Sequence, residues 1–143
     1  MAKPAKAATS FSGSFQRFND ANLNAVSLTK VGAGTLTLTG AATNSTSTGV
    51  LTVNRGAVSF RDAGTNSFTT SSIVVNEGAA LVLDDTGANN LANRLNNTGV
   101  NLMGGSLQVL GAPGAATAEA STGALTLGEK FTTADLEFRA KLS

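Results

Sequence analysis

The chain has 143 residues, a length typical of one domain, and it contains no cysteine and no histidine. These absences exclude a disulfide framework, a thiol nucleophile, metal sites of the thiolate or imidazole type, and a histidine-based catalytic triad. Ten basic and nine acidic side chains give a net charge of +1, so no strong overall field attracts nucleic acid or an anionic membrane. No apolar run approaches the roughly 20 residues of a membrane span, and the basic N-terminus lacks the apolar stretch of a secretory signal peptide.

The N-terminal segment, residues 1–25, differs from the rest of the chain in its aromatic content. Phe11, Phe15 and Phe18 are three of the seven phenylalanines and have the i, i+4, i+7 spacing of one helix face. Gly13 weakens a helix at this place. Two interpretations stay open: the segment is a cap over the first coil of a solenoid, or it is an arm that docks these phenylalanines into a partner.

Basic side chains accompany the aromatic ones in this segment. Lys3, Lys6 and Arg17 give the first 19 residues a side-chain charge of +3, which leaves −2 for the rest of the chain. A positive, aromatic arm on a slightly acidic body is suited to a large acidic partner surface. We therefore expect these six residues of the arm to dock a partner.

Residues 26–128 contain an internal repeat. Each unit has two short stretches of alternating apolar residues, joined by turn residues, and the second stretch follows a glycine. The upstream stretches of the first four units are residues 26–28, 51–53, 73–75 and 100–102, whereas the fifth unit has no clear upstream stretch. The glycines that precede the second stretches are Gly34, Gly56, Gly78, Gly105 and Gly123.

The repeat predicts an all-β fold. Alternation of apolar with small polar residues indicates half-buried strands, and a two-strand unit can bury its apolar face only by stacking on its neighbours. We expect a short right-handed parallel β-helix of about five coils, with an antiparallel sandwich or barrel as the alternative. One buried column should contain Leu36, Leu38, Val58, Phe60, Leu81, Leu83, Leu107, Val109, Leu125 and Leu127.

The repeat also resembles a known family. Residues 28–40 have a Lys-x-Gly-x-Gly-x-Leu-x-Leu-x-Gly core, and residues 49–60 have a Val-Asn-x-Gly return. Together they resemble the passenger-associated strand repeat of bacterial autotransporters. Residues 93–111 and 123–127 are similar to the long β-strand-repeat surface proteins that use the same units. The resemblance implies a β-helical stalk or scaffold, and hence a fragment of a secreted adhesin.

Some right-handed β-helices are carbohydrate-active enzymes, but the chain offers little for that chemistry. Acidic pairs need a groove between them, and the aromatic platforms for sugar rings are missing, because there is no Trp and no Tyr. Asp84, Asp85 and Asn89 could supply oxygen ligands to calcium, although a solvated turn is the favoured interpretation. Residues 89–95 could form a single helical turn. We expect no catalytic residue, no metal site and no cofactor.

The C-terminal segment, residues 129–143, predicts one amphipathic strand or cap. Four apolar residues alternate there with three charged ones. Charges on an edge strand block end-to-end stacking, and they can also pair with a neighbouring subunit. The residues that we expect at this edge or oligomer contact are Leu136, Phe138, Arg139 and Leu142.

By elimination, the sequence favours a non-catalytic structural protein. We expect a component of the virion exterior, such as a phage capsid decoration (cement) protein or a small tail or spike part. Its partners would be capsid or tail proteins, and it would form a homo-oligomer, with a trimer favoured, without nucleic acid or membrane insertion. The alternatives are a fragment of an autotransporter-type adhesin or stalk, secreted or at the bacterial cell surface, and a carbohydrate-active β-helix enzyme.

Overall fold

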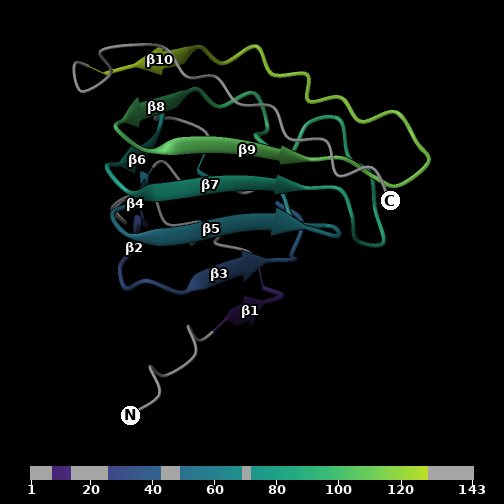
Figure 1. Cartoon of the computed structure of the whole chain (residues 1–143), viewed down its shortest axis with the longest axis horizontal. Helices are drawn as coiled ribbons and strands as arrows, with labels where there is room; N and C mark the ends of the chain where they lie inside the picture. Colours follow the sequence, from purple (N-terminus) through teal and green to yellow (C-terminus); the bar gives the residue numbers. More distant parts are fainter. Residues whose placement is uncertain (1–7, 14–25, 43–48, 69–71, 129–143) are drawn as a thin grey trace, which may run out of the picture.

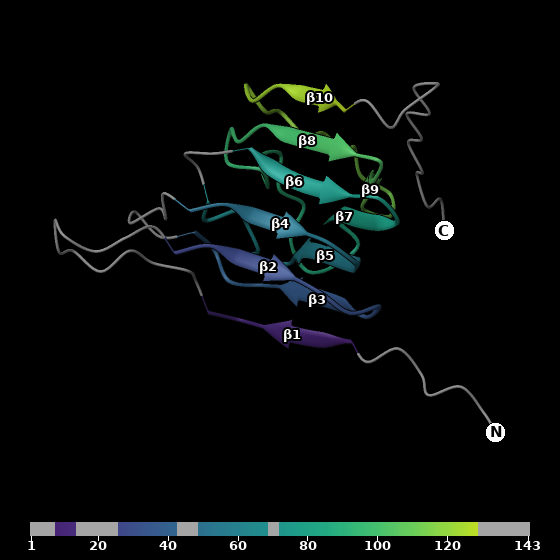
Figure 2. The same cartoon turned by 90° about the vertical axis from the view of Figure 1, so that its left-hand side faces the viewer.

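Two parallel sheets make up the fold. The computed structural model describes residues 8–13, 26–42, 49–68 and 72–128, and the ten strands in these ranges stack in the orders β1-β3-β5-β7-β9 and β10-β8-β6-β4-β2. We call these the odd sheet and the even sheet; Figure 1 looks onto the odd sheet, and Figure 2 shows the even sheet. All pairings between the strands are parallel, which confirms the expected parallel β-helix and excludes the antiparallel alternative. The odd strands are β1 (Thr9–Phe11), β3 (Thr35–Leu38), β5 (Gly56–Arg61), β7 (Ala79–Asp84) and β9 (Ser106–Leu110), and the even strands are β2 (Leu28–Lys30), β4 (Leu51–Val53), β6 (Ile73–Asn76), β8 (Val100–Met103) and β10 (Leu125–Leu127).

Each coil passes through the even sheet, turns, and returns through the odd sheet. The turns β4–β5, β6–β7 and β8–β9 are two residues long, whereas the connectors back to the even sheet are much longer, as Figure 1 shows on its right-hand side. Gly56 illustrates why glycine stands at these turns. Its φ is 72°, and a Cβ there would lie 2.5 Å from the carbonyl oxygen of Gly32 in the coil below. Only glycine fits such a close approach without strain.

The predicted core column is confirmed over four coils of the odd sheet. The register stacks Leu36, Val58, Leu81 and Leu107 on one another, and likewise Leu38, Phe60, Leu83 and Val109. The members from β5 and β7 and Leu38 of β3 are buried, whereas Leu36, Leu107 and Val109, nearer the two ends, are partly buried. Alternation at period 2 places one set of side chains inside every coil, so the sequence pattern translates directly into burial.

The same column prediction is wrong for its last two members. Leu125 and Leu127 belong to β10, which pairs with β8 in the even sheet, in register with Val100 and Leu102. They are 44% and 42% exposed, not buried. The stretch therefore corresponds to the upstream strand of a unit and not to its glycine-anchored strand. Over the described residues, the solenoid accordingly has four complete coils, with the single strands β1 and β10 at its ends.

The first 25 residues contribute a strand to the solenoid. Thr9–Phe11 pairs with β3, and Phe11 lies in register with Leu38. The backbone is extended here. The helix predicted from the phenylalanine spacing is therefore wrong at Phe11, which lies in a strand. The helical turn expected at residues 89–95 is also absent, since that stretch is mostly irregular, with a turn that begins only at residue 94. The predicted strand at residues 129–143 lies outside the described residues.

Buried and partly buried polar contacts hold the long connectors together. Arg94, which is 0% exposed, lies in the connector between β7 and β8 and pairs with Asp85. Glu119, in the connector between β9 and β10, accepts hydrogen bonds from the backbone N–H groups of Arg94 and Leu95 at 2.9 and 3.0 Å. Successive connectors are therefore joined to one another. The described residues include no helix that is long and apolar enough to cross a membrane.

Candidate docking surface at the N-terminal end

Large apolar side chains are exposed only at the two ends of the described solenoid. The coils between the ends bury or half-bury theirs. Exposed apolar side chains that gather in one place mark interaction surfaces more often than scattered ones do. The exposed residues are Phe11, Val26 and Val31 at the N-terminal end, and Leu125 and Leu127 at the C-terminal end.

Strand β1 presents Phe11 at the N-terminal end. The carbonyl oxygen of Phe11 accepts a 2.9 Å hydrogen bond from the backbone N–H of Thr39, which fixes β1 to the end of β3. The ring passes close over Gly13, because a Cβ at that glycine would lie 2.6 Å from the ring's Cζ atom. Phe11 remains 39% exposed in this position. A ring held against the backbone and partly open to solvent is a ready anchor for a partner.

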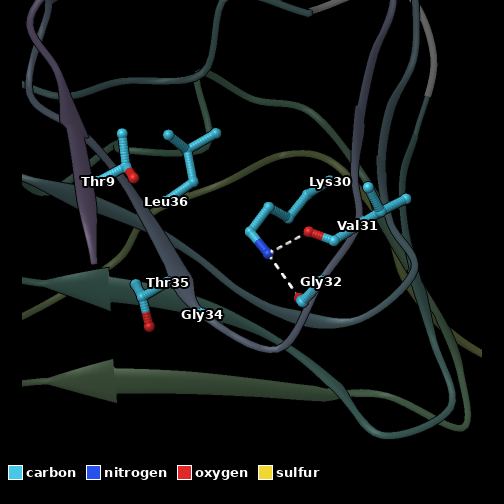
Figure 3. A pocket seen from close by; sticks show the side chains of 7 residues that line it. All are labelled: Thr9, Lys30, Val31, Gly32, Gly34, Thr35 and Leu36. Carbon is cyan, nitrogen blue, oxygen red and sulfur yellow. Dashed lines mark hydrogen bonds between the residues drawn. The ribbon is translucent and has the colours of Figure 1, made fainter. Parts of the chain in front are cut away.

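An opening of about 280 Å³ lies beside β1, at the turn between β2 and β3. Figure 3 shows its lining, which joins the first strand to the first full coil. The walls are mostly backbone and small side chains, with one charged group, the ammonium of Lys30. The lining residues are Thr9, Lys30, Val31, Gly32, Gly34, Thr35 and Leu36.

Lys30 occupies an inward position of the even sheet. The register stacks it below Val53, which continues upward through Val75 and Leu102. Its Nζ donates to the carbonyl oxygens of Val31 and Gly32, at 2.8 Å each, and to that of Arg55 in the next coil at 3.2 Å. The ammonium thus replaces the apolar side chain that every later coil has at this place. An inward charge at an edge is a known barrier to further strand stacking.

The structure describes one of the predicted site residues, Phe11, and places it on β1. The other predicted docking residues, Lys3, Lys6, Phe15, Arg17 and Phe18, lie outside the described residues. So do the predicted edge residues Leu136, Phe138, Arg139 and Leu142.

Sequence reasoning missed Lys30 as a member of the N-terminal end. The signal was present in the alignment of Leu28-Thr-Lys30 with Leu51-Thr-Val53, where a lysine stands at an apolar position. Such a break in a period-2 pattern marks either a strand end or a special site.

The acidic residues considered for chemistry are engaged in internal contacts. An Asp85 carboxylate oxygen receives the Arg94 Nε at 2.7 Å and the Leu91 backbone N–H at 3.1 Å. Asp84 accepts from the Thr86 backbone and hydroxyl and lies 3.5 Å from Arg61. Within the described residues, no group of three or more acidic side chains is placed to hold a metal ion. Comparisons of the chain with protein-family models, curated proteins and solved structures found no match.

Proposed function

We propose that the protein is a non-catalytic structural component of a large protein assembly, attached by its N-terminal end. The observation that carries this proposal is the exposure of Phe11, Val26 and Val31 at that end, with Phe11 held on β1. Burial of one such ring in a partner contributes about 1.5–3 kcal/mol of binding free energy before ordering costs. A solenoid with exposed apolar side chains at one end suits a component that is added to a preformed protein surface.

The charge distribution supports an acidic partner surface. Lys3, Lys6 and Arg17 bring a positive charge to the segment around β1, whereas the rest of the chain is slightly acidic. Opposite charge speeds association and orients the docking partner, while the aromatic contacts supply most of the affinity.

The internal engagement of the acidic groups supports a structural role. Asp62 accepts the Ala88 N–H at 2.7 Å, and Glu119 holds the backbone of residues 94 and 95. Asp84 and Asp85 contact Arg61 and Arg94. These carboxylates join connectors and neighbouring coils, so they stabilise the structure.

We further propose that this assembly is the exterior of a virion. The protein would be a phage capsid decoration (cement) protein or a small tail or spike part, and its partners would be capsid or tail proteins. A homo-oligomer, with a trimer favoured, would join several weak docking contacts, so that simultaneous engagement makes attachment effectively permanent.

A second candidate is a segment of an autotransporter-type stalk on a cell surface. It is favoured by strands β2 to β5, which stack in parallel, because the Lys-x-Gly-x-Gly-x-Leu-x-Leu pattern that begins at Lys30 resembles the repeat of that family. Mass spectrometry of purified particles and of secreted fractions separates the two candidates, because a virion component co-purifies with capsid proteins and a stalk occurs within a much longer polypeptide.

The test of the docking role uses variants of the full chain. The triple variant Lys3→Ala/Lys6→Ala/Arg17→Ala and the variant Phe11→Ser should each reduce binding to particles, with the β-sheet circular dichroism unchanged. Arg55→Ala, which removes an exposed basic side chain from a turn of another coil, is the matched control. Deletion of residues 1–18 should abolish binding. Unchanged particle binding of the deletion would reject the docking role, and loss of β-structure would reduce the segment to a cap.

A further inference from the structure

The two ends of the described solenoid present strand edges of the same kind. Among the described strands, β1 pairs only with β3 and β2 only with β4, whereas β9 pairs only with β7 and β10 only with β8. Figure 2 shows β1 and β2 at one end of the stack and β10 at the other. Each end therefore offers one edge from each sheet, and such edges can accept a further strand.

The same ends also carry complementary halves of a coil. A complete coil has an even strand followed by an odd strand, as in β8 and β9. Within the described residues, β1 is an odd strand below β3 with no even strand beside it, and β10 is an even strand above β8 with no odd strand beside it. Strand β1 of one copy and strand β10 of another thus make the coil that each of them lacks.

The register matches across such a junction. In the odd sheet, Phe11 begins the inward column that ends at Val109. In the even sheet, Leu28 begins the column that ends at Leu125. Residues paired in a parallel register point to the same side of the sheet. A second copy stacked in this register therefore places Phe11 on Val109 and Leu28 on Leu125.

The arriving apolar side chains meet an opening at the C-terminal end. A cavity of about 170 Å³ lies there, and its lining includes Val109 and Leu125. Leu125 is 44% exposed, and Phe11 at the opposite end of the chain is 39% exposed. One end-to-end contact covers both, which removes exposed apolar surface from water at two places at once.

Charge favours the pairing of unlike ends. The lining of the N-terminal opening contains one charged side chain, Lys30, and the lining of the C-terminal opening contains one of opposite sign, Glu119. Contacts between two N-terminal or two C-terminal ends bring like charges together, whereas a head-to-tail contact brings unlike charges together.

We propose that a second copy of the chain docks with β1 on the edge of β9 and β2 on the edge of β10, so that solenoids join end to end. The contact joins two different surfaces along one direction, so it does not close on itself and continues into a filament. This inference does not rest on the proposed virion role, because a copy attached to a particle by its N-terminal end still offers its C-terminal end to another copy.

The contact is weak and reversible. An end face of about 10 Å by 20 Å, for packed sheets with six-residue strands, is much smaller than the roughly 800 Å² per partner of a stable interface. The junction also places Lys30 over Leu127 of the other copy. The ammonium keeps its hydrogen bonds to three carbonyl oxygens of its own chain, but it loses its remaining contact with water.

Disulfide trapping captures a weak contact, and the chain has no native cysteine to interfere. The register places Ser10 of one copy beside Gln108 of the other, and Thr29 beside Thr126. Adjacent strands lie about 4.8 Å apart, within the Cα separation that a disulfide accepts. Chains with Ser10→Cys and chains with Gln108→Cys are mixed and mildly oxidised, and likewise Thr29→Cys with Thr126→Cys. The control mixes Ser10→Cys with Thr126→Cys, which lie on different sheets.

Mass spectrometry of the products separates the outcomes. Disulfides between unlike chains in both matched mixtures, severalfold above the control mixture, support the proposal. Disulfides mainly between identical chains would show that like ends meet, and a product in only one matched mixture would show that no complete coil forms. Equal yields in the control, or unreacted thiols throughout, would show that the ends do not dock in register. Each of these results overturns the proposal.

A change of the apolar end gives a second readout. In the Gln108→Cys chain, Leu125→Ser/Leu127→Ser should lower the yield of the disulfide with Ser10→Cys severalfold, because the docked copy then covers polar side chains. Both leucines are exposed, so circular dichroism should show an unchanged fold. Thr126→Ser, at the exposed residue between them, is the matched control and should leave the yield unchanged. An unchanged yield in the double variant would overturn the docking on this apolar end.

Discussion

The Arg94 guanidinium and the Asp85 carboxylate form a buried ion pair at 2.7 Å, inside the connector that joins β7 to β8. The same guanidinium donates from Nη1 to the carbonyl oxygens of Asp62 and Gly64, at 3.0 and 2.9 Å, and from Nη2 to that of Asn89 at 2.8 Å. Residues 62 and 64 belong to the connector of the preceding coil. One side chain therefore joins two successive connectors. Its positive charge is buried, and the Asp85 carboxylate compensates it.

Removal of one member of this pair should destabilise the fold strongly. Arg94→Met leaves a buried carboxylate and three unpaired carbonyl groups, and Asp85→Asn leaves a buried guanidinium without its counter-charge. We expect a loss of about 3–5 kcal/mol in the free energy of unfolding for each variant, measured by urea titration. The matched control is Arg61→Met, because the Arg61–Asp84 pair is longer, at 3.5 Å, and Arg61 is 44% exposed. That control should cost less than about 1 kcal/mol. Equal losses of unfolding free energy in Arg94→Met and Arg61→Met would contradict the difference in burial between the two ion pairs.

The core column offers a prediction about packing. Leu81 is fully buried in the middle of the odd sheet. Leu81→Ala should lower the free energy of unfolding by about 2–5 kcal/mol, since the neighbouring coils cannot collapse into the gap. Leu81→Asp should prevent folding, because an unpaired carboxylate would be buried. Val31→Ala, at a side chain that is 67% exposed, is the control and should change stability by less than about 0.5 kcal/mol. Thermal unfolding followed by circular dichroism measures all three; a stable Leu81→Asp protein would refute the burial of this column.

The sequence predicted the stack of coils well because the determining signal is local. Alternation places Val58 and Phe60 on one side of a strand, and the repeated unit dictates which strand lies above it. The pattern could not assign Leu125 and Leu127 to a sheet, since Leu-Thr-Leu reads the same in both sheets. Only the path of the preceding connector decides the matter.

The buried Arg94 shows a different limit. Its connector has no periodicity, and an arginine in an Asn-rich stretch looks like a solvated residue. Its role follows from carbonyl groups that come from an earlier coil, a relationship that the linear sequence does not display. The sequence pointed to Phe11 in the N-terminal segment, but the inward Lys30 was recognised only once the register was known.

Gly40 controls the attachment of β1. A Cβ at this position would lie 2.6 Å from the carbonyl oxygen of Ser12, so the chain immediately after β1 passes directly over the glycine. Gly40→Ala should displace β1 and free the Thr39 amide, which now donates to Phe11. Hydrogen exchange should show at least tenfold faster exchange of the Thr39 amide, with the amides of β5 and β7 still protected. The control Ala41→Gly, at the next residue, should keep the Thr39 amide protected. Slow exchange in Gly40→Ala would mean that β1 tolerates the methyl group.

Lys30 should limit self-association at the N-terminal end. Lys30→Met turns the lowest member of an otherwise apolar column into an apolar one, and it removes the charge that a stacked coil would have to bury. Two effects then act together: the new end attracts a second apolar edge, and the carbonyl oxygens of Val31, Gly32 and Arg55 lose their donor. The first effect is the larger for association, because those carbonyls remain within reach of water.

Sedimentation velocity over a hundredfold range of protein concentration measures the effect. Lys30→Met should form species larger than those of the wild-type protein, in a manner that increases with concentration. Arg55→Met is the control: it removes the same charge and adds a similar apolar chain, but Arg55 lies exposed at the side of a turn and not inside the column. If the sedimentation profile of Lys30→Met matches that of the wild type, the inward lysine is not a barrier to stacking. If Arg55→Met associates as strongly as Lys30→Met, loss of positive charge alone explains the association, and the inward position of Lys30 does not contribute to it.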